Sequence, residues 1–290
     1  MQRIAGGILV VSMLAMPAFA LGQDKSVTPA DQYKAWRKEY DRTSGSGRIM
    51  TDAERLKFIG EAYKRRYAFA AKFVDLAEKH PNDPVALDAL TQAVWQVNNT
   101  PWPVELVGED PSRSKAFELI QRDHIRSDKL GPLCQRVSYG LCKEYEAFLR
   151  AVLAKNPHKE VLATASLSLG QFLNHRLQRI DLCRGQPEQA KEFADLFGKE
   201  YIAELLRQDR NKAVKEIETA FEQAAEKYGD VKFPGGESVA DRVKDELFAI
   251  RTLSVGKAAP DIDGEDQDGK RFKLSDYRGK AVMLDFWSYV

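Results

Sequence analysis

The chain has 290 residues, of which 43% are hydrophobic, 30% charged and 10% aromatic, so it is not a wholly disordered, collagen-like or low-complexity protein. Its 44 basic and 43 acidic residues leave a net charge of +1, which provides no general attraction to nucleic acid or to an anionic membrane. Three cysteines are too few for a scaffold built on disulfides.

Residues 1–20 have the pattern of a secretory signal peptide. Arg3 precedes an apolar run over residues 4–16, and residues 18–20 read Ala-Phe-Ala, an A-x-A cleavage site. A membrane anchor is the alternative, but it needs roughly 20 apolar residues, more than this run supplies. We therefore expect an exported protein, periplasmic or extracellular, with no transmembrane segment after removal of the signal.

Strong helix formers dominate residues 30–253, and Gly and Pro cluster at intervals within them. A cap-like Thr-Asp-Ala-Glu at residues 51–54 and a break at residues 80–84 bound the first expected helix. The same order of helix, break and helix then returns twice. We expect three helix pairs, at residues 51–79 with 85–97, at 141–155 with 160–177, and at a helix ending near 226–229 with 239–252.

An apolar stripe with the spacing i, i+4, i+7 recurs in the first helix of each pair. Successive copies are 76 and 72 residues apart, which is longer than a single tetratricopeptide unit. The stripes predict stacked antiparallel helix pairs, either as a tetratricopeptide-like repeat or as an irregular helical bundle. A repeat would provide a concave surface for peptides or proteins, whereas a bundle would act as a spacer or support. The stripe residues are Phe69, Phe73 and Leu76, then Tyr145, Leu149 and Val152, then Ile217, Phe221 and Ala224.

The helical pattern ends at Val255. Residues 261–266 and 271–274 flank an Asp-Gly turn, a combination that predicts a β-hairpin. Residues 281–287, Ala-Val-Met-Leu-Asp-Phe-Trp, have the composition of a buried strand. The expected fold is therefore mainly α, followed by a short segment of β-structure.

Residues 255–287, VGKAAPDIDGEDQDGKRFKLSDYRGKAVMLDFW, resemble the opening of redoxin domains. These are the alkyl hydroperoxide reductase/thiol-specific antioxidant family and the exported thioredoxin-like thiol:disulfide oxidoreductases. The G-K-x-A-P entry, the L-S-D-Y-R-G-K turn and the strand ending in F-W occur in the family's order and spacing. The resemblance implies that residues 255–290 are the N-terminal part of an incomplete thioredoxin-like α/β domain. It also implies thiol–disulfide exchange or peroxide reduction as the activity of the full-length parent.

The resemblance further implies where the reactive cysteine belongs. In this fold the strand equivalent to residues 281–287 leads to a helix N-terminus, whose free N–H groups lower the pKa of a cysteine there. Two or three residues separate F-W from C-x-x-C in thioredoxin-like members, so the first cysteine would follow Val290. Either the sequence is part of a longer oxidoreductase, or the gene ends here and the helical residues do the work with a vestigial redoxin tail. In both cases we expect the 290 residues to be redox-inactive, and we assign no catalytic or cofactor-binding residue.

The three cysteines lie outside any Cys-x-x-Cys motif. Cys134 and Cys142 flank a break at residues 138–140, where they are expected either to form a structural disulfide or to remain two buried thiols. Cys183 is expected to be a lone thiol.

Metal and nucleotide motifs are also absent from the sequence. The histidines, His80, His124, His158 and His175, lack zinc-like spacing, and no Gly-rich phosphate loop occurs. The acidic residues between 261 and 268 lack the glycine and final glutamate of a calcium loop, so they are expected on the solvent face of the hairpin. We therefore expect no metal and no cofactor. Trp95 and Trp102 are expected to pack at a helix end and its loop, or else to be exposed for binding.

The partners that fit these features are proteins of the cell envelope, including disulfide-bearing ones. Nucleic acid is not among them, because the charge is balanced.

Overall fold

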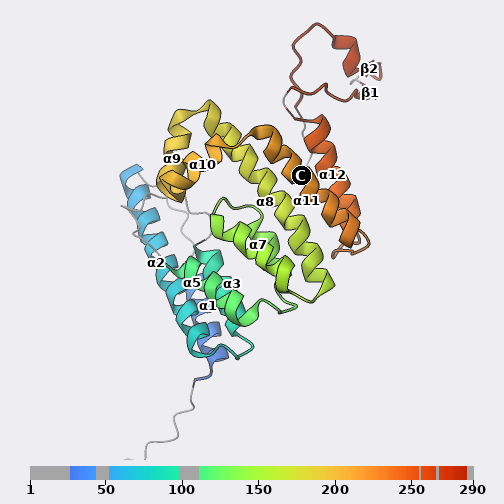
Figure 1. Ribbon diagram of the computed structural model, residues 1–290. Helices are drawn as coiled ribbons and strands as arrows, with labels where there is room; N and C mark the ends of the chain where they lie inside the picture. The colour runs from blue at the N-terminus through green and yellow to red at the C-terminus, as the bar shows by residue number, and fades with distance from the viewer. Residues whose placement is uncertain (1–26, 44–51, 98–110, 255, 266–267, 286–290) are drawn as a thin grey trace, which may run out of the picture.

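The computed structural model describes residues 27–43, 52–97, 111–254, 256–265 and 268–285. The expected signal peptide, the loop that contains Trp102 and the last residues of the expected strand lie outside the described residues. Helices occupy most of the described chain, and two short strands follow them (Figure 1). The helices are α1 (Pro29–Thr43), α2 (Asp52–Lys79), α3 (Ala86–Gln96), α5 (Ser112–Leu119), α6 (Gly131–Val137), α7 (Lys143–Lys155), α8 (Lys159–Gly185), α9 (Pro187–Phe197), α10 (Lys199–Arg207), α11 (Arg210–Tyr228) and α12 (Val239–Thr252). A π-helical turn, Ile120–His124, follows α5.

The three expected helix pairs are α2 with α3, α7 with α8, and α11 with α12, and the two members of each pair pack on one another. Helix α12 begins where the sequence predicts because Ser238 caps it, the Ser238 Oγ accepting a hydrogen bond from the Asp241 N–H at 3.1 Å. Helix α8 continues eight residues beyond its expected end at Leu177. Residues 178–184 are helix formers without a breaker, so nothing ends the helix before Gly185.

All nine stripe residues are buried, as expected. Each buried large apolar side chain stabilises the fold by about 1.5–3 kcal/mol relative to an exposed one. Helix α8 is the central element, since α6, α7, α9, α10, α11 and α12 all contact it. Its first half is correspondingly buried over residues 163–170.

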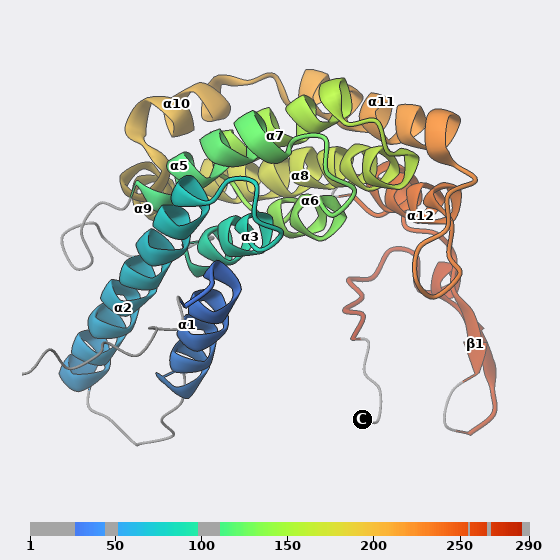
Figure 2. The ribbon, with the colours of Figure 1, turned by 90° about the horizontal axis from the view of Figure 1, so that it is seen from below.

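Helix α1 packs on α2 through aromatic side chains. Tyr33 and Trp36 place their ring centroids 5.5 and 6.1 Å from that of Phe73, and Tyr40 lies 5.6 Å from Phe69. These edge-on and tilted contacts are the favoured geometry for aromatic pairs. In Figure 2 the helices form a curved array with α1 and α2 at one end and α12 at the other. None of the described helices combines the length and the apolar character that crossing a membrane requires.

The C-terminal segment leaves the helices at the end of α12 (Figures 1 and 2). Strands β1 (Asp263–Glu265) and β2 (Arg271–Lys273) form the expected antiparallel hairpin, with Gly264 opposite Phe272. Gly269 in the turn has a φ of 75°, a conformation that glycine adopts without strain. The mainly α fold followed by a hairpin is thus confirmed. Residues 281–285 differ from expectation: they form no strand, because no neighbouring strand in the described part of the chain offers them ladder hydrogen bonds.

Candidate functional site

The redoxin-like segment, described over residues 256–265 and 268–285, is stabilised by hydrogen bonds between its own residues. The Asp261 carboxylate accepts two hydrogen bonds of 2.8 Å, from the N–H and the Oγ–H of Ser275. The Leu274 N–H also donates to the Ile262 carbonyl at 2.9 Å. Hydrogen bonds from Ser275 lower the pKa of Asp261, so the carboxylate stays ionised and keeps both bonds at neutral pH. These bonds join the start of the segment to the 3₁₀ turn Leu274–Tyr277.

The hairpin and the 3₁₀ turn also share an aromatic contact. The ring centroids of Phe272 and Tyr277 lie 6.5 Å apart in an edge-on arrangement. A Cβ at Gly264 would lie 3.4 Å from the Phe272 ring, so the ring lies directly over this glycine. The Lys273 N–H donates to Asp276 at 2.9 Å. The L-S-D-Y turn therefore has a defined local structure on the hairpin.

The acidic residues of the hairpin face solvent and basic neighbours. Asp263 lies 3.9 Å from Lys273, and Glu265 lies 3.5 Å from Arg271, across the two strands. All four side chains are more than half exposed, so these pairs contribute little to stability. For Asp263 and Glu265 the expected solvent face is confirmed.

The apolar residues after the turn are exposed. Met283 is 94% exposed, and Val282 and Leu284 are about half exposed, at 46% and 49%. Three consecutive exposed apolar side chains are unusual for a folded surface and are typical of a segment that packs against a partner. These residues are those that the resemblance places in the core of a redoxin domain.

The cysteines of the helical part are buried free thiols. Burial raises the pKa of Cys134, of Cys142 and of Cys183, although the Arg113 guanidinium opposes this effect at Cys142. A thiol with a raised pKa supplies little thiolate at neutral pH and is a poor nucleophile. Of the two alternatives for Cys134 and Cys142, the structure contains the buried thiols.

The turn between Cys134 and Cys142 is held by side chains instead of a disulfide. The His175 Nδ1–H donates to the Ser138 carbonyl at 2.9 Å, and Arg179 donates to the Gly140 carbonyl at 2.9 Å. Tyr201 of α10 donates to the Leu141 carbonyl at 3.0 Å. Three backbone carbonyls are thus satisfied by α8 and α10. The His175 ring therefore has a structural role, the hydrogen bond of its Nδ1 to this turn.

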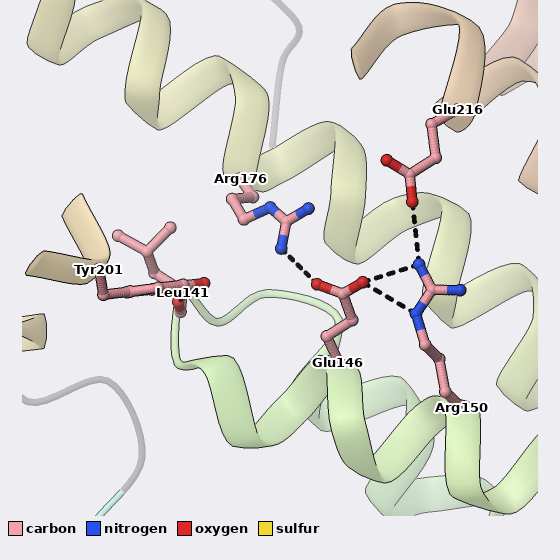
Figure 3. A network of polar contacts seen from close by, with 6 residues as sticks. All are labelled: Leu141, Glu146, Arg150, Arg176, Tyr201 and Glu216. Carbon is pink, nitrogen blue, oxygen red and sulfur yellow. Dashed lines mark hydrogen bonds and ion pairs between the residues drawn. The ribbon is translucent and has the colours of Figure 1, made fainter. Parts of the chain in front are cut away.

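A polar network lies next to this turn (Figure 3). The Glu146 carboxylate lies between two guanidinium groups, those of Arg150, at 2.7 Å, and Arg176. Arg150 also reaches Glu216 of α11 at 2.9 Å. Burial raises the pKa of Glu146, but the two arginines outweigh burial and hold it below its usual value. The network therefore joins α7, α8 and α11, and its Glu146 carboxylate is ionised at neutral pH.

Other candidate residues do not converge. Among the described residues, no group of three His, Cys, Asp or Glu side chains is placed to hold a metal ion. His124 is half-buried, and burial lowers its pKa. At His158 it is the backbone N–H that donates, to the Asn156 side chain at 2.9 Å. Trp95 is exposed, with the Arg136 guanidinium 5.2 Å from its ring centroid. Sequence reasoning missed the Glu146 network because two of its pairs join distant parts of the chain: Arg176 is 30 residues from Glu146, and Glu216 is 66 residues from Arg150.

The comparisons with known proteins identify the C-terminal segment. Residues 255–289 match the AhpC/TSA family. The chain is 45% identical over 42 residues to "Thiol-disulfide oxidoreductase ResA" of Geobacillus thermodenitrificans, a match that covers 14% of this chain and 24% of that protein. It is 50% identical over 36 residues to the Bacillus subtilis protein of the same name, covering 12% and 20%.

The chain therefore spans about a quarter or less of the length of these curated relatives. No solved structure is significantly similar to it. The matched residues form a redoxin-like segment, as the sequence predicts.

Proposed function

We propose that residues 255–289 are the first part of a thiol–disulfide exchange domain in an exported protein whose helical part precedes that domain. The match of these residues to the AhpC/TSA family and to thiol-disulfide oxidoreductases is the observation that carries the proposal. The Asp261–Ser275 bonds and the contact of Phe272 with Tyr277 support it, because they give the segment the compact entry that precedes a core strand.

The chemistry proposed for the whole domain is the general one for this reaction. A cysteine thiolate attacks one sulfur of a substrate disulfide, and the other sulfur leaves as a thiolate. A second cysteine then displaces the substrate from the mixed disulfide, so the substrate is reduced and the two protein cysteines are oxidised to a disulfide. Cys134, Cys142 and Cys183 do not take part, because they are buried and their pKa values are raised.

Two measurements test this proposal. Sequencing of the gene through codon 290 and beyond is expected to find Cys-x-x-Cys directly after Val290. The 290-residue chain itself is expected to reduce insulin disulfides no faster than a variant in which all three cysteines are serine. A frame without Cys-x-x-Cys would refute the proposal, and turnover that depends on Cys134, Cys142 or Cys183 would refute the inactivity of this chain.

A peroxidase and a disulfide reductase are distinguished by the substrate that the longer protein reduces. The longer protein is expected to reduce insulin disulfides with a dithiol as electron donor. If it consumes hydrogen peroxide and leaves insulin oxidised, the activity is peroxide reduction.

The second candidate function is protein binding by the helical part with a vestigial redoxin tail. The curved array of helix pairs with buried stripes favours it (Figure 2). Removal of residues 255–290 is then expected to leave the urea unfolding midpoint and the binding of envelope proteins unchanged. Loss of binding on this removal would count against it.

A further inference from the structure

A groove lies between α8 and α12 and has α11 as its floor. Helices α8 and α12 both pack on α11 but contact one another little. A hydrogen bond of 2.8 Å from Gln171 to Glu246 closes one end. Beyond that bond the two helices form the sides of an open groove of about 820 Å³. Its other end reaches Leu253 and Ser254, directly before the redoxin-like segment.

The floor and the α12 wall of this α8–α12 groove are largely aliphatic, whereas the α8 wall is mostly polar. Leu177 lies on the α8 wall, and Ile250 and Leu253 lie on the α12 wall. Val214 and Ile217 of α11 form the floor. Leu253 is 59% exposed, so an occupant of the groove would cover apolar surface that water now contacts.

Two carboxamide side chains line the α8 wall of the groove. Asn174 and Gln178 are four residues apart on α8, so they project from one face of the helix. Neither side chain has a hydrogen-bond partner among the residues that the structure describes. A carboxamide has both donors and an acceptor, which matches the alternating N–H and C=O groups of a peptide backbone.

One end of the groove carries a net positive charge. The Asp181 carboxylate pairs with Arg184 at 2.7 Å and with the Nε of Arg210 at 2.8 Å, so one negative charge faces two positive ones. Arg184 also donates a hydrogen bond of 2.7 Å to the Gln208 carbonyl. The Arg210 side chain is 50% exposed and lines the groove, and its hydrogen bond to Asp181 uses only the Nε donor. An additional carboxylate is therefore favoured beside Arg210.

The length of the wall defines the size of the occupant. Arg184 follows Asn174 by ten residues along α8, so this wall is about 15 Å long at 1.5 Å per residue. An extended chain rises about 3.3 Å per residue, so the wall accommodates about four or five extended residues.

We propose that the α8–α12 groove binds an extended polypeptide segment that has aliphatic side chains and an acidic residue at the Arg210 end. The inference rests on the proposed function for one point only, that the bound chain is a disulfide-bearing substrate held next to the redox domain. The groove ends at Ser254, so a polypeptide bound there is retained beside residue 255, where the redoxin-like segment begins.

The test is binding of a labelled probe peptide to the full 290-residue chain, measured by fluorescence anisotropy. The probe is a seven-residue peptide of valine, leucine and serine with one glutamate and no cysteine. Saturable binding is expected, and a second probe with lysine in place of glutamate is expected to bind about tenfold more weakly, as the loss of one charge-assisted contact predicts.

The variants Arg210→Glu and Ile250→Asp are each expected to weaken binding of the glutamate probe by about tenfold or more. Their matched controls are Lys215→Glu on α11 and Phe248→Asp on α12, neither of which lines this groove. Arg210→Glu lies at an exposed position in the first turn of α11, where a carboxylate suits the helix dipole, so this variant is expected to fold. It is also expected to prefer the lysine probe.

Any one of three results would overturn the inference. The first is the absence of saturable binding of the glutamate probe up to about 1 mM. The others are an equal loss of affinity in the groove variants and their controls, and equal affinity for the two probes. Because the probe contains no cysteine, these results do not depend on redox activity. The gene sequence and the insulin assay test the proposed function separately.

Discussion

Gly170 of α8 lies directly against the ring of Phe221 of α11. A Cβ added at Gly170 would stand 2.7 Å from two carbons of that ring. Phe221 is fully buried and belongs to the third apolar stripe. The absence of a side chain at Gly170 therefore allows α8 and α11 to approach closely, and α8 is the helix on which most of the others pack.

Gly170→Ala is expected to destabilise the protein by about 1–3 kcal/mol, because the added methyl group overpacks the α8–α11 contact. Urea unfolding followed by far-UV circular dichroism measures the change. Gly185→Ala at the end of α8 is the control, since its Cβ would meet nothing within 4 Å. Equal stability of the two variants would mean that the two helices are not in such close contact.

Glu146→Gln is expected to lower the free energy of unfolding by about 2 kcal/mol, the usual size of lost hydrogen bonds to a charged group. The change leaves Arg176, whose side chain is only 11% exposed, without its counter-charge. Glu216→Gln is the control: its partner is the same Arg150, but the Glu216 side chain is 51% exposed. This variant is expected to lose less than about 1 kcal/mol. A loss as large as that of Glu146→Gln would contradict the ranking.

The contribution of Glu146 is expected to depend on pH. Its folded-state pKa is lowered, so the stabilisation is complete above its unfolded pKa of about 4.3 and is lost as the pH falls through the lower folded value. The difference in unfolding free energy between the original protein and Glu146→Gln should therefore be constant from pH 7 to about 5 and shrink below about pH 4. A difference that grows on acidification would show that the pKa is raised instead.

The three thiols are expected to be free and protected in the native protein. At neutral pH the folded chain should react negligibly with a chromogenic aromatic disulfide, because all three cysteines are buried and their pKa values are raised. Unfolding in guanidinium without reductant should release three reactive thiols. A Cys134→Ser, Cys142→Ser double variant should release one. Release of a single thiol from the original chain would instead show that two of the three cysteines form a disulfide.

The helix pairs and the hairpin were predictable from the sequence because their signals are local. The 3.6-residue period of the stripes and the Asp-Gly turn each act within a few residues, so they define α2, α7, α11 and the β1–β2 hairpin without reference to the rest of the chain. The redoxin-like character of residues 255–287 was likewise readable from the order and spacing of its motifs, and the family match over residues 255–289 confirms it.

The tertiary structure decided what depends on distant residues. The state of Cys134 and Cys142 was open in the sequence, and the turn between them is held by His175, Arg179 and Tyr201, whose side chains come from α8 and α10. The Glu146 network and the α8–α12 groove arise in the same way, from the packing of helices that are far apart in the chain. Local periodicity specifies which face of a helix is buried, but only the three-dimensional arrangement determines which polar groups meet beside that face and where two helices diverge.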